Sequence, residues 1–256
     1  MDKAPLTEHL YELRNRIVVS LVAVSITFGF CFSYSENIFS ILTLPLHNTI
    51  NFSLHNPFIS FVPTEKELSL VFLAPAEALW MHLKIALISA CIISSPIIFH
   101  QVWKFIAPGL KPKEKKFAIP FIFVTTNLFL IGALFCFLIV LPFAVNFLMT
   151  YKTENIKPML SAEKYIDFCL KFILAFGAVF ELPVLQVFLT RMGILTTDFL
   201  AKNRKYAVLL AFVAAALLTP TPDAFNQSLM AVPIVILYEA GIWASRIINR
   251  KKKEEI

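Results

Sequence analysis

One acidic residue, Glu181, stands in the middle of a long uncharged run that extends from Phe172 to Thr190. If this run crosses a membrane, a charge at that depth costs roughly 2.5–3.5 kcal/mol even on lenient insertion scales. Such a carboxyl group needs a partner, a water-filled cavity or a proton. Lys84, inside another apolar run, is one candidate for an internal partner. The bond could instead be reserved for the transmembrane helix of another protein.

Two other acids lie where a cationic partner could reach them. Glu12 belongs to a segment with apolar residues at helical spacing, which predicts an amphipathic helix leading into the first apolar run. The spaced residues are Leu6, Leu10, Leu13 and Ile17. Glu114 is the only acid among five lysines in the segment 100–116. Either carboxylate could bind a guanidinium. Alternatively, Glu12 pairs with Arg16 at i,i+4, and neighbouring lysines neutralise Glu114.

The sequence contains no pattern of an enzyme or a metal site. It has no P-loop, H-E-x-x-H, G-x-S-x-G or C-x-x-C motif, and its five histidines are scattered. A carboxylate pair for an intramembrane hydrolase could be imagined from Glu181 and Glu239, but nothing places them together. The four cysteines, in or beside apolar runs, are interpreted as small apolar residues: Cys31, Cys91, Cys136 and Cys169. We therefore expect no catalytic residue, cofactor or metal.

The composition predicts an all-α polytopic membrane protein. Hydrophobic residues make up 58% of the 256 residues and charged residues 16%, against roughly 25% charged in soluble proteins. The mean hydropathy is +0.73. The apolar runs are long and lack a period of two, which favours helices over strands. Six spans are predicted, at Ile17–Tyr34, Pro75–Phe99, Ile119–Pro142, Phe168–Leu189, Tyr206–Leu218 and Ser228–Ser245. Pro96 should kink the second.

The basic residues predict that both termini are cytoplasmic. Lysine and arginine gather in the N-terminus, in the loops 100–118 and 191–205, and in the tail 246–256, and are sparse on the other side. The isoelectric point near 9.1 therefore reflects topology and not a nucleic-acid partner. We expect one membrane domain over residues 1–256, with a cytoplasmic amphipathic segment 1–16, an apolar outer loop 36–74 that caps the membrane, and a basic tail near anionic lipid.

The last two spans are predicted to be short. The fifth has 13 uncharged residues from Tyr206 to Leu218, or roughly 20 Å of helix against a hydrocarbon core of about 30 Å. The sixth has 15 uncharged residues between Asp223 and Glu239. This edge should thin the bilayer and expose Thr219 and Gln227 to partner helices.

Three ordered blocks of sequence resemble the TatC family, the multispanning core of the twin-arginine protein translocase. They cover most of the chain. The first block is L-T-E-H-L-Y-E-L-R-N-R at 6–16, and the second holds the F-I-x-P-x-L and E-[KR]-[KR] elements at 101–116. The third begins with F-G-A-V-F-E-L-P at 176–183 and continues with T-P-T-P-D-A-F-N-Q at 219–227, A-V-P at 231–233 and L-Y-E at 237–239. One departure is that Thr221 separates Pro220 from Pro222, where the family commonly has adjacent prolines.

The resemblance implies a receptor and not an enzyme. The family binds signal peptides with two consecutive arginines on folded precursor proteins. It works with the single-span TatA and TatB proteins in the cytoplasmic (inner) membrane, self-associates and is driven by the proton motive force.

The resemblance also implies roles for individual residues. By position, Glu12 and Glu114 match the family's arginine-binding acids. Arg14 and Phe105, in the same motifs, are expected to take part in signal-peptide binding with them. Glu181 matches its intramembrane glutamate. Thr219 and Gln227 match the family's polar positions near the last two spans, where partner helices dock. We assign Lys84 to the same set of intramembrane polar residues.

The alternative function is a small secondary transporter with Lys84, Glu181 and Glu239 as substrate or proton sites. It predicts inverted halves and broken helices. The proline and glycine positions of the two halves do not correspond, which disfavours it.

Overall fold

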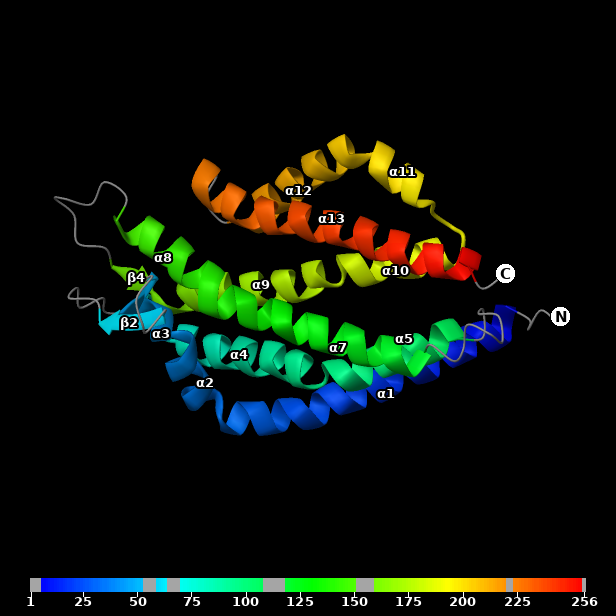
Figure 1. Cartoon of the computed structure of the whole chain (residues 1–256). Helices are drawn as coiled ribbons and strands as arrows, with labels where there is room; N and C mark the ends of the chain where they lie inside the picture. Colours follow the sequence, from blue (N-terminus) through cyan, green and yellow to red (C-terminus); the bar gives the residue numbers. More distant parts are fainter. Residues whose placement is uncertain are drawn as a thin grey trace.

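The computed structural model describes residues 6–52, 59–63, 70–107, 118–150, 159–219 and 223–254, and it is a bundle of helices (Figure 1). The first helix, α1 (Leu6–Ser33), runs without a break from the amphipathic segment into the first apolar run. The start of α1 and the end of α13 (Ala224–Glu254) lie at the same end of the bundle. We call the opposite end the distal end.

The predicted outer loop contains ordered elements at the distal end. After α1 come α2 (Ser35–Leu42) and α3 (Leu44–His47). An antiparallel hairpin follows, in which β1 (Asn48–Phe52) pairs with β2 (Ile59–Pro63). The capping of the membrane by residues 36–74 stays a prediction.

The predicted kink in the second apolar run is confirmed. The run forms α4 (Glu77–Ile93) and α5 (Ser95–Ile106), bent by 56° at the break between them. Pro96 lies in the first turn of α5. A proline lacks the N–H that would continue the α-helical ladder and its ring crowds the preceding turn, so the helix bends there.

The third apolar run is longer than predicted. It forms α7 (Ala118–Phe135), the π-helical turn η2 (Cys136–Val140) and α8 (Leu141–Thr150), so the predicted end at Pro142 is wrong. A π-turn inserts an extra residue into the ladder. The π-turn lies just before Pro142, whose nitrogen cannot donate to the helical ladder, and the helix continues through that residue.

The fourth apolar run is central in the bundle and also begins earlier than predicted. It forms α9 (Ala162–Phe180) and α10 (Leu182–Arg191). The Ser161 side chain caps α9 by accepting a hydrogen bond from the Lys164 backbone N–H, and this cap explains why the helix begins before Phe168. Two short strands precede α4 and α9: β3 (Leu70–Val71) and β4 (Leu160–Ser161). They pair in parallel, and this pairing joins the starts of the two helices.

The last part of the chain forms α11 (Thr197–Lys202), α12 (Arg204–Leu218) and α13. The prediction that the fifth apolar run forms a short helix is confirmed, since α12 has 15 residues; that α12 crosses the membrane stays a prediction. The prediction that the last helix is short is wrong, because α13 has 31 residues. Glu239 does not end it, because glutamate is a good helix former, and its carboxylate pairs with Arg204.

By length and composition, four helical segments of the described chain can cross a membrane, and the bent α4–α5 pair makes five. The four are Leu10–Ser33, Ile119–Met149, Ala162–Arg191 and Ala224–Ile248. The short α12 falls outside this set.

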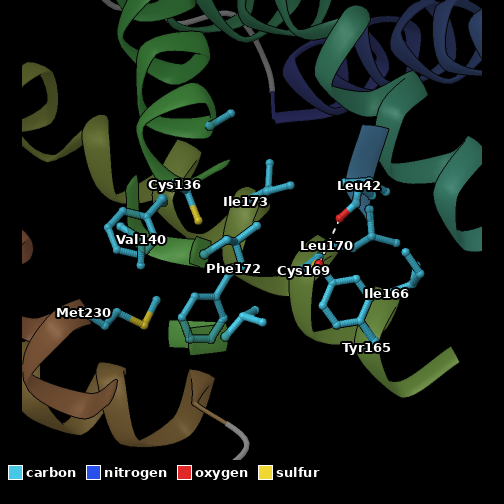
Figure 2. Close-up of a cluster of buried hydrophobic side chains, with 14 of the residues drawn as sticks. Leu42, Cys136, Val140, Tyr165, Ile166, Cys169, Leu170, Phe172, Ile173 and Met230 are labelled. Atoms are coloured by element: carbon cyan, nitrogen blue, oxygen red, sulfur yellow. Dashed lines mark hydrogen bonds between the residues drawn. The ribbon is translucent and has the colours of Figure 1, made fainter. Parts of the chain in front are cut away.

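The core surrounds α9, which packs against α4, α7, α12 and α13. Figure 2 shows Val140, Phe172 and Met230 brought together from η2, α9 and α13. Near the distal end, the buried Tyr165 hydroxyl donates to the Leu42 carbonyl at 2.9 Å, which ties α2 to α9.

Candidate functional site

The N-terminal turns of α1 place Glu12 beside Arg16. Arg16 Nη2 donates to Glu12 Oε1 at 3.0 Å, and both side chains are 30% exposed. Arg16 Nη1 also reaches Gln101 Oε1 on α5 at 3.5 Å, so the pair sits against a neighbouring helix. The predicted i,i+4 pair therefore forms, while Glu12 Oε2 makes no hydrogen bond within the described residues.

The other residues predicted for this site are only partly described. Arg14 is exposed on α1, and Phe105 is half-buried near the end of α5. Glu114 lies outside the described residues, so its predicted proximity to Glu12 stays a prediction. The buried Gln101 was missed by the sequence reasoning, although it lies within the second quoted block.

Glu181 forms the one-residue break between α9 and α10. Its backbone N–H donates to the Ala178 carbonyl at 3.1 Å, and its carbonyl accepts from the Leu185 N–H at 2.9 Å. Pro183 lies in the first turn of α10. The side-chain Oε1 is buried and has no hydrogen-bond partner among the described residues. This oxygen is therefore a buried polar atom whose hydrogen-bonding capacity is unused within the described residues.

Lys84 is not the partner of Glu181. Its Nζ lies 2.5 Å from Glu163 Oε1 and 2.9 Å from Asp167 Oδ1, both in the first turns of α9. Asp167 precedes Glu181 by 14 residues, or roughly 21 Å of helix. The internal Glu181–Lys84 bond is therefore absent. Glu163 and Asp167 share one face of α9 at i,i+4, a spacing that could have revealed this cluster in the sequence. The cluster was missed because the predicted helix began at Phe168, after both acids.

A second polar network ties α4 to α9 at the distal end. The buried Glu77 carboxylate accepts from the Ala74 N–H at 3.1 Å, from the Glu163 N–H at 3.3 Å and from the Ser161 hydroxyl. These bonds satisfy N–H groups at the starts of both helices, which have no partner within their own helix.

Glu239 is also paired within the chain. Arg204 Nε and Nη2 donate to its two carboxylate oxygens at 2.5 and 2.9 Å, a bidentate arrangement between α12 and α13. The neighbouring Tyr238 hydroxyl donates to the Leu200 carbonyl at 2.9 Å. The sequence could have indicated the Arg204–Glu239 pair, because the two residues carry opposite charges at similar depths in two consecutive apolar runs.

Thr219 and Gln227 lie at the distal ends of α12 and α13. The Thr219 hydroxyl is buried and donates to the Ala215 carbonyl at 2.8 Å. Gln227 Nε2 is half-buried and donates to the Phe212 carbonyl at 3.0 Å, so it bridges the two helices. The intervening residues 220–222, which include Thr221, lie outside the described residues.

The structure thus distributes the predicted residues over three places. Glu12, Arg14 and Phe105 belong to the end of the bundle where the described chain starts, Glu181 to a helix break, and Thr219 and Gln227 to the distal edge of α12 and α13. Within the described ranges, no three His, Cys, Asp or Glu side chains are grouped so that they could hold a metal ion.

Comparison with known proteins finds one matching family. The family model described as "Sec-independent protein translocase protein (TatC)" matches residues 8–233. A protein of the same name from Carboxydothermus hydrogenoformans is 40% identical over 254 residues, which cover 98% of each chain. The Aquifex aeolicus protein of that name is 39% identical over 252 residues, again 98% of each chain.

Solved structures agree with the sequence comparison. A crystal structure described as the twin arginine translocase receptor TatC in DDM superimposes with a TM-score of 0.79 and 38% identity, covering 93% of this chain and 99% of that one. A second crystal structure of the twin arginine translocase receptor TatC gives a TM-score of 0.78 and 37% identity. These chains share the fold described above.

Proposed function

Since this chain belongs to the TatC family of Sec-independent protein translocase proteins, which are transport components and not enzymes, we propose that it is a receptor for twin-arginine signal peptides. The peptides would belong to folded precursor proteins at the cytoplasmic face. Export would use the proton motive force. The ion pairs disfavour the secondary-transporter alternative, because Lys84 and Glu239, two of its three proposed substrate or proton sites, are each paired within the chain.

The observation that carries this proposal is the state of the Glu12 carboxylate. Oε1 is occupied by Arg16, whereas Oε2 makes no hydrogen bond within the described residues, and the side chain is 30% exposed. A guanidinium from a second chain can therefore bind Oε2 without breaking the existing pair. Two consecutive arginines need two carboxylates, and Glu114 is the acid proposed for the second.

The proposed topology has six spans with both termini in the cytoplasm. Its support is that the start of α1 and the end of α13 lie at the same end of the bundle, as an even number of crossings requires (Figure 1). Among the described elements, the start of α1, the end of α5, the end of α10 and α11 lie toward that end, and they carry basic residues: Arg14, Arg16, Lys104, Arg191 and Lys202. In this topology α4–α5 is one bent span and α12 is the short fifth span, in a bacterial inner membrane.

We further propose that TatA-like and TatB-like single-span proteins dock beside α9, α12 and α13, and that several copies of the chain associate. Support comes from Glu181, whose buried Oε1 has no partner among the described residues. A polar side chain from a neighbouring helix would satisfy it. Thr219 and Gln227 already bond to backbone carbonyls, so each could offer its remaining hydrogen-bonding capacity to a docked helix.

The test is the affinity of a twin-arginine precursor for the purified chain and its acid-to-amide variants. Glu12→Gln or Glu114→Gln should each weaken binding by about ten-fold or more, because a charge-assisted bond contributes roughly 1.5–3 kcal/mol. The matched control is Glu36→Gln, an exposed acid on α2. Unchanged affinity in the double variant Glu12→Gln/Glu114→Gln would refute the assignment.

A further inference from the structure

A groove at the distal end is separate from all the residues discussed for peptide binding. It has a volume of about 790 Å³ and is formed by α8, β4, α9 and the last turn of α12. One part of its lining is polar and charged, and the other part is apolar. The lining residues that matter here are Leu148, Lys164, Asp167, Phe168, Lys171 and Leu217.

Two lysines in the groove have no anionic partner within the described residues. Lys164 and Lys171 are both exposed and lie seven residues apart, on one face of α9, about 10 Å along the helix. No ion pair to either side chain occurs in the described chain. Lys171 is flanked by apolar residues, a position that is costly in a membrane unless the ammonium group meets an anion or reaches the interface.

The acid that lines the groove makes no ion pair with either lysine and offsets their charge only in part. Asp167 lies between them in the sequence, but its carboxylate binds Lys84, from α4, at 2.9 Å. Lys84 also holds Glu163 at 2.5 Å. Among the described residues that line the groove, Asp167 is the one acid, and it shares Lys84 with Glu163, so this cluster keeps one net negative charge against the two ammonium groups of the groove. The groove and the cluster together therefore keep a net positive charge.

The apolar part of the lining indicates what kind of anion fits. Leu148, Phe168 and Leu217 extend the groove with hydrocarbon, and Leu217 is 82% exposed. A free phosphate would leave this surface uncovered, and an apolar partner helix would leave two ammonium groups without counter-ions. An amphiphile with an anionic head covers both parts.

We propose that this groove binds an anionic glycerophospholipid, with the phosphate between Lys164 and Lys171 and the acyl chains along Phe168 and Leu217. This inference does not depend on signal-peptide binding. Because α8, α9 and α12 all line the groove, the bound lipid would connect α12, which packs on few other helices, to the centre of the bundle.

The test is lipid retention by the purified full chain, measured by native mass spectrometry after delipidation. Phosphatidylglycerol should be retained more tightly than phosphatidylcholine of the same acyl composition. The double variant Lys164→Gln/Lys171→Gln should lose about thirty-fold in affinity, the equivalent of about 1 kcal/mol per lysine. Lys164→Arg/Lys171→Arg should retain the lipid, because it keeps both charges.

The matched control is Lys104→Gln/Lys202→Gln, two exposed lysines at the opposite end of the bundle. It should retain phosphatidylglycerol as the unmodified chain does. Equal retention of the two lipids, an equal loss in the control, or full displacement by inorganic phosphate would each overturn the proposal. So would efficient cross-linking of Leu217→Cys between two copies in the presence of phosphatidylglycerol, which would assign the groove to a second chain.

Discussion

Charged residues inside the apolar runs differ in whether they have a partner within the described chain. Lys84 and Glu239 each meet an opposite charge from a neighbouring helix. Glu181 instead keeps a buried oxygen without a partner among the described residues. A paired charge is part of the fold's internal bonding, whereas an unsatisfied one costs free energy that a second molecule can recover. The pairing state thus separates structural residues from candidates for docking.

Lys84→Met should destabilise the chain while Glu181→Gln should not. Removing Lys84 leaves Glu163 and Asp167 side by side without a cation, and we expect a loss of about 1–2 kcal/mol, since these side chains are about a third exposed. Glu181→Gln removes no bond within the described chain. Unfolding in mixed micelles measures both variants; equal losses would contradict the assignment.

A double-mutant cycle makes the comparison specific. Lys84→Met and Asp167→Asn should combine less than additively, because both remove the same ion pair. Lys84→Met and Glu181→Gln should add, since roughly 21 Å of helix separates Glu181 from the Lys84 cluster. Strict additivity of the first pair would show that the Lys84–Asp167 bond contributes nothing to stability.

The sequence singled out charged residues but did not reveal their partners. Glu181 and Lys84 stood out because a charge in an apolar run is costly wherever the chain folds, and Glu12 stood out as an acid that a cationic partner could reach. Their partners depend on which helices become neighbours, and a single sequence does not contain that information. The Glu12–Arg16 pair was predictable because both residues lie on one helix.

At the scale of elements, α10 and α13 approach closely at a glycine of α13. An added Cβ at Gly241 of α13 would lie 2.9 Å from the Pro183 Cα of α10 and 2.2 Å from Gln186 Oε1. Small residues permit such close helix contacts in membranes. Ser245, one turn later, is buried as well, so α13 presents a small-residue face.

Gly241→Ala should therefore destabilise the α10–α13 contact. Overpacking of this kind typically costs about 1–3 kcal/mol, and the backbone atom of Pro183 cannot simply rotate away. Gly29→Ala is the matched control, because a Cβ there has nothing within 4 Å. Thermal unfolding in detergent should show a loss for Gly241→Ala only. Similar melting temperatures for the two variants would show that the helices separate without cost.

The short α12 should make function depend on bilayer thickness. Its 15 residues cover about 22 Å, less than the roughly 30 Å hydrocarbon core. Transport and partner docking should therefore be strongest in lipids with short acyl chains and fall as the chains lengthen. Reconstitution into a graded series of lipids measures this, and a flat response from thin to thick bilayers would rule out a role for the mismatch.

Element boundaries were predicted less well than element identities. Apolar runs predicted helices wherever the structure has its long helices, and Pro96 predicted the bend. The ends were wrong at Pro142, where a π-turn lets the helix continue, and at Phe168, where Ser161 caps the helix earlier. Both errors arise because backbone hydrogen bonding sets helix ends, whereas the pattern reports only hydrophobicity.

At the scale of the whole molecule, the fold separates the proposed activities in space. Glu12 belongs to the first turns of α1, whereas the lysine groove, with Thr219 in its lining, is formed by α8, β4, α9 and the end of α12. The start of α1 and the β4 strand lie at opposite ends of the bundle (Figure 1). Composition and the three sequence blocks predicted this class of protein and its family, and the comparisons confirm both. The groove was not predictable, because it is assembled from helices far apart in the sequence.

The central claim is that this chain recognises two consecutive arginines. The most direct measurement is capture of a twin-arginine precursor by the purified chain in nanodiscs, compared with the same precursor carrying two lysines. Because a guanidinium presents five N–H donors in a rigid planar fork, whereas a lysine ammonium is a compact and strongly hydrated point charge, we predict that the lysine precursor binds at least ten-fold more weakly. Equal capture of the two precursors would contradict the account.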